Sequence, residues 1–306
     1  MSGPTACVDL GTNTCLLLVA EPYGAGHRVL VDVSRITRLG QGVDRARVLH
    51  PDARARVLAC LGDYARMADA HGATRRLLVT TSAMRDAADG PAFLAEIRER
   101  TGFDARIIGG DEEAELTWLS AAADFARPCE PMVAFDVGGG STEVMQGEGA
   151  RLVSRRSLEV GGVRLTERLL SHDPPTPGEL TALRAAVRDA LPGAAPPPGA
   201  RLVGLAGTVT TLACVARARP THDAQGVHGS ALSRDDVTAL VDALAALPAR
   251  ERLRHPALDP GRADVIVAGA AIVEAVMAWA GASSLVVSNG GVRWGLYLRA
   301  VTGRAG

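Results

Sequence analysis

Three consecutive glycines, placed after an apolar stretch and an aspartate, constrain the fold of this chain more than any other feature. The segment reads Phe135-Asp136-Val137-Gly138-Gly139-Gly140-Ser141-Thr142-Glu143. An apolar run that ends in consecutive glycines predicts a buried strand entering a tight turn. Because glycine has no Cβ, such a turn can bring its backbone close to a ligand. Its successive N–H groups can form a concave anion site, so the segment predicts a phosphate-binding turn.

Two carboxylates accompany this turn. Asp136 precedes the glycines and Glu143 follows them. Carboxylate oxygens are ligands that hard divalent cations such as Mg²⁺ prefer. Amides for a phosphate and carboxylates for a metal together indicate metal-assisted phosphate chemistry.

The N-terminal part of the chain repeats this pattern. Asp9-Leu10-Gly11-Thr12-Asn13-Thr14 shares with residues 136–142 an aspartate, an aliphatic residue and a glycine, followed by small polar residues. Alone, the first segment is equally compatible with an ordinary buried hairpin. The pair predicts an internal duplication of a β-hairpin phosphate loop, distinct from the Rossmann and P-loop types. Two such loops can hold a phosphate chain and a metal between two domains.

Charged residues follow two further predicted strands. Arg85 follows the strand predicted at 76–81, and ligands of open α/β sheets collect at strand C-termini. It is therefore a candidate phosphate contact, with a solvated arginine at a helix start as the alternative. Four acids open the helix after the strand predicted at 105–108: Asp111, Glu112, Glu113 and Glu115. Acids in a first helical turn often serve as dipole partners, but one of these is also a candidate general base.

Two weaker candidates come later in the sequence. Gly207 and Thr208 follow an apolar strand and can bind a ligand or cap the next helix, and the N-cap is the favoured interpretation. His222, Asp223 and His228 lie in a polar loop. A solvated loop is favoured there over a metal site.

Length and composition limit the classes of protein to consider. At 306 residues the default expectation is two domains, and residues 127–131 are a credible junction. The formal net charge of −1 and the 3% aromatic content argue against a nucleic-acid partner. Every basic residue other than histidine is arginine, so any cationic phosphate contact must come from arginine.

Cysteine content and hydropathy suggest a location. The five cysteines include no CxxC pair and indicate reduced thiols in a cytoplasmic protein. No N-terminal targeting segment is expected. The longest apolar stretch, 265–280, is interrupted by Glu274, and a buried helix is favoured there over a membrane span.

Seven motifs, taken in order along the chain, resemble the exopolyphosphatase and guanosine pentaphosphate phosphohydrolase (Ppx/GppA) family, within the actin, sugar kinase and heat-shock ATPase superfamily. They occupy residues 9–14, 81–87, 111–114, 136–143, 161–166, 206–212 and 262–264. The resemblance implies an α/β fold with two RNase H-like domains around a cleft. Residues 1–127 with the C-terminal helix 292–306 would form the first domain, and 128–291 the second.

The resemblance also implies a reaction. Water would attack a terminal phosphoanhydride and release orthophosphate from inorganic polyphosphate or from guanosine pentaphosphate. Neither nucleic acid nor a membrane would be a partner, and a homodimer is left open. Because the chain stops after the two core domains, short polyphosphate is the expected polymer. A binding sensor of the same fold without turnover, or a kinase of the superfamily, are the alternatives.

Roles for individual residues follow from the matched motifs. Glu113 matches the general base, and Asp136 and Glu143 match acids that position the metal and the water. The metal, Mg²⁺ or another divalent cation, is expected on Asp9, Asp136 and Glu143. The expected phosphate contacts are Thr12, Asn13, Thr14, Arg85, Gly138, Gly139, Gly140, Ser141, Thr142, Gly207 and Thr208.

Four positions depart from the family pattern. Leu16 stands where arginine is frequent, and Glu115 replaces an arginine. Asn289 and Trp294 stand where acids are usual. These departures affect the expected substrate choice more than the expected catalysis, since Glu113, Asp136 and Glu143 are intact.

Overall fold

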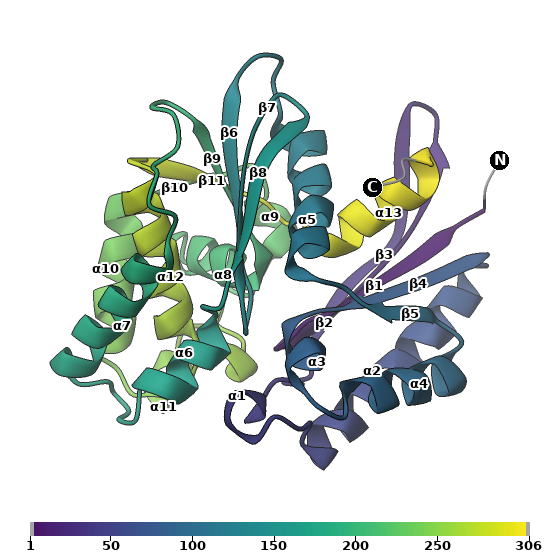
Figure 1. The fold of residues 1–306 in the computed structure, drawn as a ribbon, viewed down its shortest axis with the longest axis horizontal. Helices are drawn as coiled ribbons and strands as arrows, with labels where there is room; N and C mark the ends of the chain where they lie inside the picture. Colours follow the sequence, from purple (N-terminus) through teal and green to yellow (C-terminus); the bar gives the residue numbers. More distant parts are fainter. Residues whose placement is uncertain (1–2, 304–306) are drawn as a thin grey trace. The chain divides into compact units, whose positions relative to one another are not determined.

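The computed structural model describes residues 3–303, which form two compact units. Unit 1 comprises Met1–Ser120 and Val292–Gly306, and unit 2 comprises Ala121–Gly291. Each unit has its own β-sheet (Figure 1). Each also has its own hydrophobic core. The border between the units falls within one helix, α5 (Gly110–Phe125). A division into domains at 127/128 remains a prediction.

Unit 1 contains a five-stranded sheet in the order β3-β2-β1-β4-β5. The first three strands are an antiparallel meander, and β4 and β5 run parallel to β1. Their bounds are β1 Thr5–Leu10, β2 Thr14–Tyr23, β3 Gly26–Ile36, β4 Arg75–Thr80 and β5 Asp104–Ile107. The predicted strand–turn–strand at the N-terminus is confirmed by the β1–β2 pair.

Helices cover both faces of this sheet. In Figure 1, α2 (Pro51–Ala70) and α4 (Gly90–Thr101) lie on one side and α13 (Val292–Thr302) on the other. Successive strand residues point to opposite faces, so Val8 packs toward α2 and α4 while Cys7 packs toward α13. The short helices α1 (Val43–Ala46) and α3 (Ser82–Asp86) follow β3 and β4.

Unit 2 repeats this strand arrangement. Its sheet has the order β10-β11-β9-β6-β7-β8, in which β6, β7 and β8 are antiparallel and β9 is parallel to β6 and β11. The bounds are β6 Pro131–Val137, β7 Thr142–Glu148, β8 Arg151–Leu158, β9 Arg201–Leu205, β10 Ala231–Ser233 and β11 Ser284–Val287. The order β8-β7-β6-β9-β11 is the counterpart of β3-β2-β1-β4-β5, so both units have the predicted RNase H-like α/β fold and the predicted duplication is confirmed at the level of topology.

Helices complete unit 2. They are α6 Gly162–Leu169, α7 Pro177–Ala190, α8 Ala206–Ala216, α9 Ala224–Val227, α10 Arg234–Ala245, α11 Ala249–Arg252 and α12 Ile266–Trp279, with a 3₁₀ turn at Pro260–Arg262. The predicted buried helix at 265–280 is α12, and most of its residues are inaccessible to solvent. Among residues 3–303, no helix is long and apolar enough to cross a membrane.

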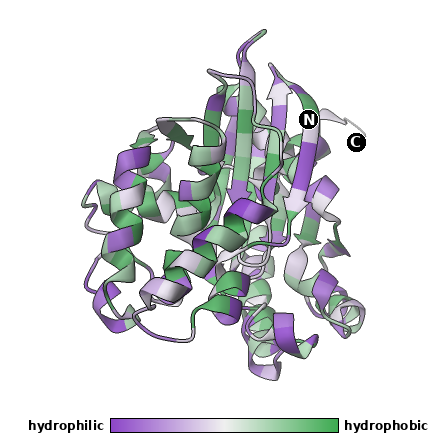
Figure 2. Cartoon of the chain, turned by 60° about the vertical axis from the view of Figure 1, so that its left-hand side comes forward, coloured by the Kyte–Doolittle hydropathy of each residue, from purple (hydrophilic) through white to green (hydrophobic). Residues whose placement is uncertain are grey.

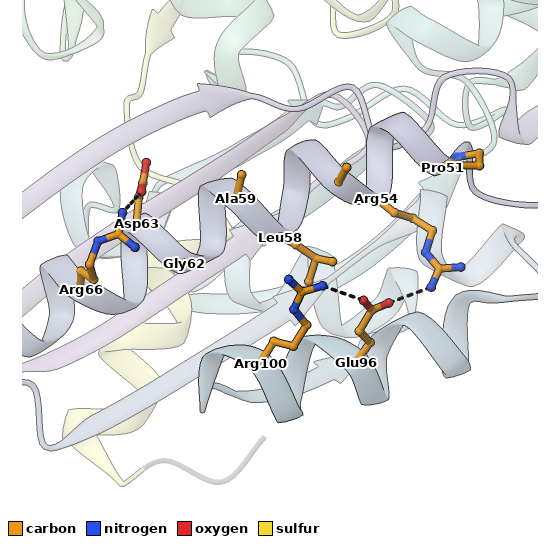
Figure 3. A pocket seen from close by; sticks show the side chains of 10 residues that line it. Pro51, Arg54, Leu58, Ala59, Gly62, Asp63, Arg66, Glu96 and Arg100 are labelled. Atoms are coloured by element: carbon orange, nitrogen blue, oxygen red, sulfur yellow. Dashed lines mark hydrogen bonds and ion pairs between the residues drawn. The ribbon is translucent and has the colours of Figure 1, made fainter.

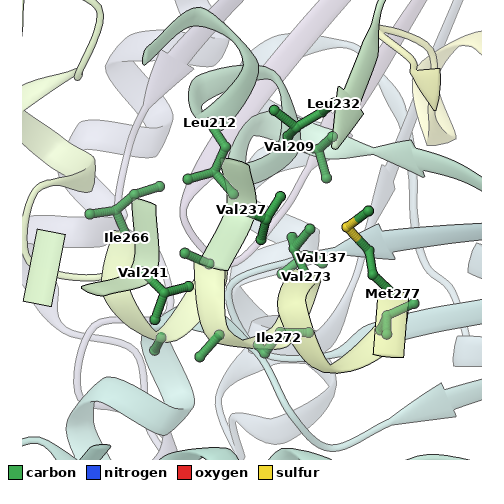
Figure 4. Packing of buried hydrophobic residues seen from close by; sticks show 14 of the residues in the cluster. Val137, Val209, Leu212, Leu232, Val237, Val241, Ile266, Ile272, Val273 and Met277 are labelled. Carbon is green, nitrogen blue, oxygen red and sulfur yellow. The ribbon is translucent and has the colours of Figure 1, made fainter. Parts of the chain in front are cut away.

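The core of unit 2 fixes the end of strand β6. Figure 4 shows Val137, the last residue of β6, among side chains from α8, α10 and α12, including Val209, Val237 and Val273. In Figure 2 hydrophilic and hydrophobic residues alternate along the helices, as expected for helices with one apolar face. Since close-packed interiors resist displacement, the turn that follows Val137 starts from a rigid point.

Candidate active site

The glycine turn of unit 2 connects β6 to β7. The Gly138 amide donates to the Ser141 carbonyl at 3.0 Å and closes the turn. A Cβ on Gly138 would lie 2.9 Å from that same oxygen, which is closer than real Cβ contacts. Glycine is therefore required at 138 for the close approach within the turn.

The carbonyls of this turn are held by α6. Gly162 N donates to Gly138 O at 3.0 Å, and Val163 N donates to Gly139 O at 2.8 Å. In a planar trans peptide the C=O of one residue and the N–H of the next point in opposite directions. The amides that follow these carbonyls therefore face away from α6, and with Ser141 they form a row of three.

These three amides, of Gly139, Gly140 and Ser141, are available to an anion. None of them donates a hydrogen bond within residues 3–303. Adjacent backbone N–H groups with a common direction are a recurrent phosphate site in proteins. The phosphate-binding role of this turn remains a prediction.

The two acids of this hairpin are neighbours across the strands. Asp136 and Glu143 are directly opposite each other in the β6–β7 register. Glu143 is 1% exposed and accepts a 2.7 Å hydrogen bond from the hydroxyl of Ser157 on β8. Burial of a carboxylate is unfavourable unless hydrogen bonds or cations compensate it, so this pair suits a cation.

A divalent cation fits this pair of carboxylates if substrate phosphates and water supply its other ligands. Within the described residues, no three His, Cys, Asp or Glu side chains come together closely enough to hold a metal. Mg²⁺ is commonly bound by one or two carboxylates, with substrate phosphates and water supplying the other oxygens. Asp136 and Glu143 match that mode. Asp9 belongs to unit 1, and its predicted role as a third ligand remains a prediction.

The first glycine turn has the same construction in unit 1. Gly11 N donates to Thr14 O at 2.9 Å, as Gly138 does to Ser141. Gly40 N donates to Thr12 O at 2.8 Å, and two amides, of Thr37 and Arg38, donate to Asn13 O. The register places Leu16 opposite Asp9, so this hairpin has one acid where the second has two.

Arg85 and Glu113 meet within unit 1. Arg85 Nη1 donates to Glu113 Oε2 at 2.8 Å and to the Ile108 carbonyl at 2.9 Å. Glu113 lies in the first turn of α5 and is 8% exposed. The alternative of a solvated arginine at a helix start is wrong, because Arg85 occupies the last turn of α3 and is ion-paired.

The neighbouring acids of α5 have other partners. Glu112 accepts hydrogen bonds from both Arg106 Nη1 at 2.6 Å and Arg299 Nη1 at 2.8 Å. The Arg106 hydrogen bond lowers the pKa of Glu112. Glu115 accepts from Arg299 Nη2 at 3.3 Å. Glu112 and Glu115 thus connect α5 to β5 and α13, and Glu113 is the acid that contacts Arg85.

The prediction that Thr208 caps a helix is wrong. Helix α8 begins at Ala206, its N-cap position is Leu205, and no side chain caps it. Ala206 has a φ of 71°, a left-handed conformation that residues with a Cβ rarely adopt. The Thr208 hydroxyl donates instead to Val137 O at 3.4 Å, which joins the first turn of α8 to the strand before the glycine turn. A Cβ on Gly207 would lie 2.2 Å from Arg262 Nη2.

The two histidines of the loop at 222–228 have partners within unit 2. His222 Nε2 lies 3.3 Å from the Thr210 hydroxyl, and burial lowers the pKa of His222. His228 Nδ1 accepts from the Asn289 amide at 3.1 Å. At the start of α13, Arg293 forms a buried two-point ion pair with Asp32, at 2.9 and 3.1 Å. Arg293 therefore fastens α13 to β3 inside unit 1.

A surface groove also occurs on unit 1, and no residue of the glycine turn at 11–14 lines it. It has a volume of about 710 Å³ and lies between α2 and α4 (Figure 3). Its arginines are neutralised, since Arg66 pairs with Asp63 while Arg54 and Arg100 both pair with Glu96. None of the predicted site residues lines it.

Comparison with known proteins gives the family. A family model described as the Ppx/GppA phosphatase family matches residues 19–303. Exopolyphosphatase 2 of Mycobacterium tuberculosis is 40% identical over 283 residues, which are 88% of this chain and 88% of the relative.

Two solved structures are similar over nearly their whole length. An exopolyphosphatase from Cytophaga hutchinsonii has a TM-score of 0.90 at 26% identity, covering 99% of both chains. A Ppx/GppA enzyme from Aquifex aeolicus has a TM-score of 0.82 at 29% identity, covering 97% of this chain and 99% of the other. The chain therefore belongs to the Ppx/GppA phosphatase family and is a phosphatase.

Proposed function

We propose that this enzyme hydrolyses the terminal phosphoanhydride bond of inorganic polyphosphate or of guanosine pentaphosphate and releases orthophosphate. The observation that carries the proposal is the row of free amides at Gly139, Gly140 and Ser141 beside the carboxylate pair of Asp136 and Glu143. A relative with 40% identity is named an exopolyphosphatase, which supports polyphosphate as the first substrate to test.

Glu113 is proposed as the general base that accepts a proton from the attacking water. Its position in the first turn of α5, next to Arg85, supports this role. A phosphate group competes well for an arginine, because guanidinium and phosphate form strong charge-assisted pairs. An incoming substrate that binds Arg85 would release Glu113 to contact the water.

The amides of the glycine turn are proposed to bind the phosphoryl oxygens as negative charge shifts among them. Preorganised donors of this kind stabilise a phosphoryl-transfer transition state without reorganisation. The remaining predicted phosphate contacts are assigned to the rest of the phosphate chain. They are Thr12, Asn13, Thr14, Gly138, Thr142, Gly207 and Thr208.

Asp136 and Glu143, with Asp9 as the third predicted ligand, would hold the divalent cation. When bound, Mg²⁺ would neutralise charge on the phosphate oxygens. The hydrogen bond from the Ser157 hydroxyl holds the Glu143 carboxylate in one orientation, which supports its role as a metal ligand. A preference for short polyphosphate and a cytoplasmic location remain predictions, and a homodimer remains open.

The test is orthophosphate release in the presence of Mg²⁺, measured in parallel on short polyphosphate, long polyphosphate and guanosine pentaphosphate. Glu113→Gln keeps the shape of the side chain but removes the base, and general-base catalysis contributes about 10²- to 10⁴-fold. We expect a loss of that size on the preferred substrate. Asp111→Asn, an exposed acid in the same helical turn, is the matched control and should keep wild-type turnover.

Two outcomes would contradict the proposal. Full activity of Glu113→Gln would remove Glu113 as the base. Tight binding of these substrates by the wild type without any orthophosphate release would favour the alternative of a binding sensor. The departures at Leu16, Glu115, Asn289 and Trp294 motivate that alternative.

A further inference from the structure

We infer that Arg164 is a positioning residue for the phosphate turn: its guanidinium fixes the Gly140–Ser141 peptide so that the Ser141 amide faces the substrate. This inference rests on the proposed function, since it assigns a task within the same site. It concerns a side chain to which the sequence motif at 161–166 assigned no role.

Arg164 contacts the turn with both its backbone and its side chain. Its amide donates to Gly139 O at 3.0 Å, and its Nε donates to Gly140 O at 2.6 Å. Together with the amides of Gly162 and Val163, it engages the carbonyls of all three glycines, Gly138 to Gly140. The last of these three carbonyls is held by the Arg164 side chain.

Arg164 is buried and donates hydrogen bonds inside the protein, unlike a charged side chain on the surface. The residue is 4% exposed, and its Nη2 lies 3.0 Å from Oε2 of Glu159, whose own side chain is 67% exposed. Transfer of a guanidinium from water into the protein is unfavourable unless its donors find acceptors. A shorter neutral donor or an apolar side chain would satisfy the packing more simply, which indicates that the interaction with the turn is the reason for the arginine.

Gly161 permits this close contact. A Cβ at that position would lie 2.4 Å from Gly139 O and 2.6 Å from the carbonyl carbon of Gly140. Gly161 itself is extended, with φ −151° and ψ 160°, a conformation open to any residue. The requirement for glycine is therefore space, because the start of α6 lies directly against the turn.

Loss of the Arg164 side chain should change the direction of one peptide. Gly140 has no Cβ, so the Gly140–Ser141 peptide can rotate at little steric cost once its carbonyl is released. Rotation would turn the Ser141 N–H away from an anion and bring the carbonyl oxygen toward it. The turn would then lose one donor and gain one repulsive dipole.

The experiment compares Arg164→Met, which keeps the apolar stem, with Arg164→Lys, which keeps the charge but moves the donor. Glu159→Gln is the control, because it alters the exposed ion-pair partner and leaves the Nε contact intact. Binding of inorganic phosphate is measured by calorimetry, and KM and kcat are measured on the preferred polyphosphate. The dissociation constant and KM do not depend on the fraction of protein that is folded, so a merely structural role would leave both unchanged.

For Arg164→Met and Arg164→Lys we expect the dissociation constant for inorganic phosphate and KM to rise about tenfold, as for loss of one hydrogen bond to a charged group. Glu159→Gln should stay within about twofold of the wild type, since exposed ion pairs contribute little. If Arg164→Met is unfolded by circular dichroism, the Arg164→Lys values decide.

The outcomes separate this inference from the proposed function. Wild-type phosphate affinity and KM in a folded Arg164 variant would overturn the positioning role while hydrolysis stands. An inactive wild type would overturn the hydrolytic function, and the phosphate-binding measurements would still test Arg164. A wild type that binds no inorganic phosphate would overturn the role of the turn itself.

Discussion

The turn at 11–14 in unit 1 and the turn at 138–141 in unit 2 close with the same hydrogen bond, at 2.9 and 3.0 Å. Their side chains differ at equivalent register positions. Leu16 lies opposite Asp9, whereas Glu143 lies opposite Asp136. The duplicated hairpin therefore provides a similar backbone twice, but a carboxylate pair only in unit 2.

The two turns also differ in what holds their carbonyls. In unit 1 the donors to Thr12 and Asn13 are backbone amides from residues 37–40. In unit 2 the donors come from the start of α6, and the Arg164 side chain completes the set. Unit 1 places its candidate base elsewhere, on α5 at Glu113. The carboxylate pair and the turn held by an arginine side chain thus belong to unit 2, and the predicted base belongs to unit 1.

The largest expected effect comes from removing the carboxylate pair. We expect Asp136→Asn or Glu143→Gln to lower Mg²⁺-dependent orthophosphate release by about 10³-fold, because metal-assisted charge neutralisation is worth several kcal/mol. The measurement is initial rate against Mg²⁺ concentration. The variants should also need more Mg²⁺ to reach half-maximal rate.

Leu16→Met is the matched change in the other hairpin and should stay within about twofold, since it conserves volume in a position without a charge. A loss for Leu16→Met as large as that for Glu143→Gln would break the comparison, because the two hairpins would then contribute equally.

A smaller effect should distinguish the two sets of carbonyl donors. A Cβ at Gly161 meets backbone atoms of the unit 2 turn at 2.4 to 2.6 Å, so Gly161→Ala must displace the turn. We expect a loss of about 100-fold in kcat/KM, the size seen when one preorganised donor is lost. A wild-type rate for Gly161→Ala would show that the turn tolerates movement.

Gly40→Ala is the counterpart in unit 1. Its Cβ would meet Thr12 Cγ2 at 2.1 Å, while the nearest backbone atom is at 3.3 Å. A side chain can rotate away, so the loss should be tenfold or less. The double variant Gly40→Ala with Thr12→Ser, which lacks that methyl group, should recover most of it. Equal losses at Gly40 and Gly161 would contradict the proposed difference between the turns.

Local patterns predicted much of this molecule. Apolar runs ending in glycine predicted both hairpins, and the apolar stretch 265–280, interrupted only by Glu274, predicted α12. The order of the seven motifs along the chain predicted the family, which the family model confirms. These features depend on residues close in sequence, where periodicity and turn chemistry are informative.

Contacts between distant residues could not be predicted in this way. Arg164 reaches Gly140 across 24 positions, and Arg299 reaches Glu112 across 187. No periodicity encodes such pairs. The start of α8 was misplaced for a related reason, since Ala206 adopts a left-handed φ of 71° that local preference disfavours. Glu115 replaces an arginine of the family pattern, but the guanidinium of Arg299 lies 3.3 Å from its carboxylate, so a positive charge is present there.

The smallest expected effect concerns Glu112, the neighbour of the proposed base. Its pKa is lowered from 4.5, first by the Arg106 hydrogen bond. A lowered folded-state pKa means that this carboxylate stabilises the fold above about pH 4.5, and the stabilisation is lost as the pH falls through the folded-state value. Glu112→Gln should therefore lower the free energy of unfolding by about 1 kcal/mol at pH 7.

The difference between Glu112→Gln and the wild type should shrink as the pH falls below about 4.5 and through the folded-state pKa of Glu112, as measured by urea unfolding at several pH values. Orthophosphate release should stay near the wild-type rate, in contrast to Glu113→Gln. This pair of variants tests whether unit 1 contributes to the reaction through one acid of α5 alone. A catalytic loss in Glu112→Gln comparable to that in Glu113→Gln would mean that the ion pairs of Glu112 with Arg106 and Arg299 also fix the position of the base.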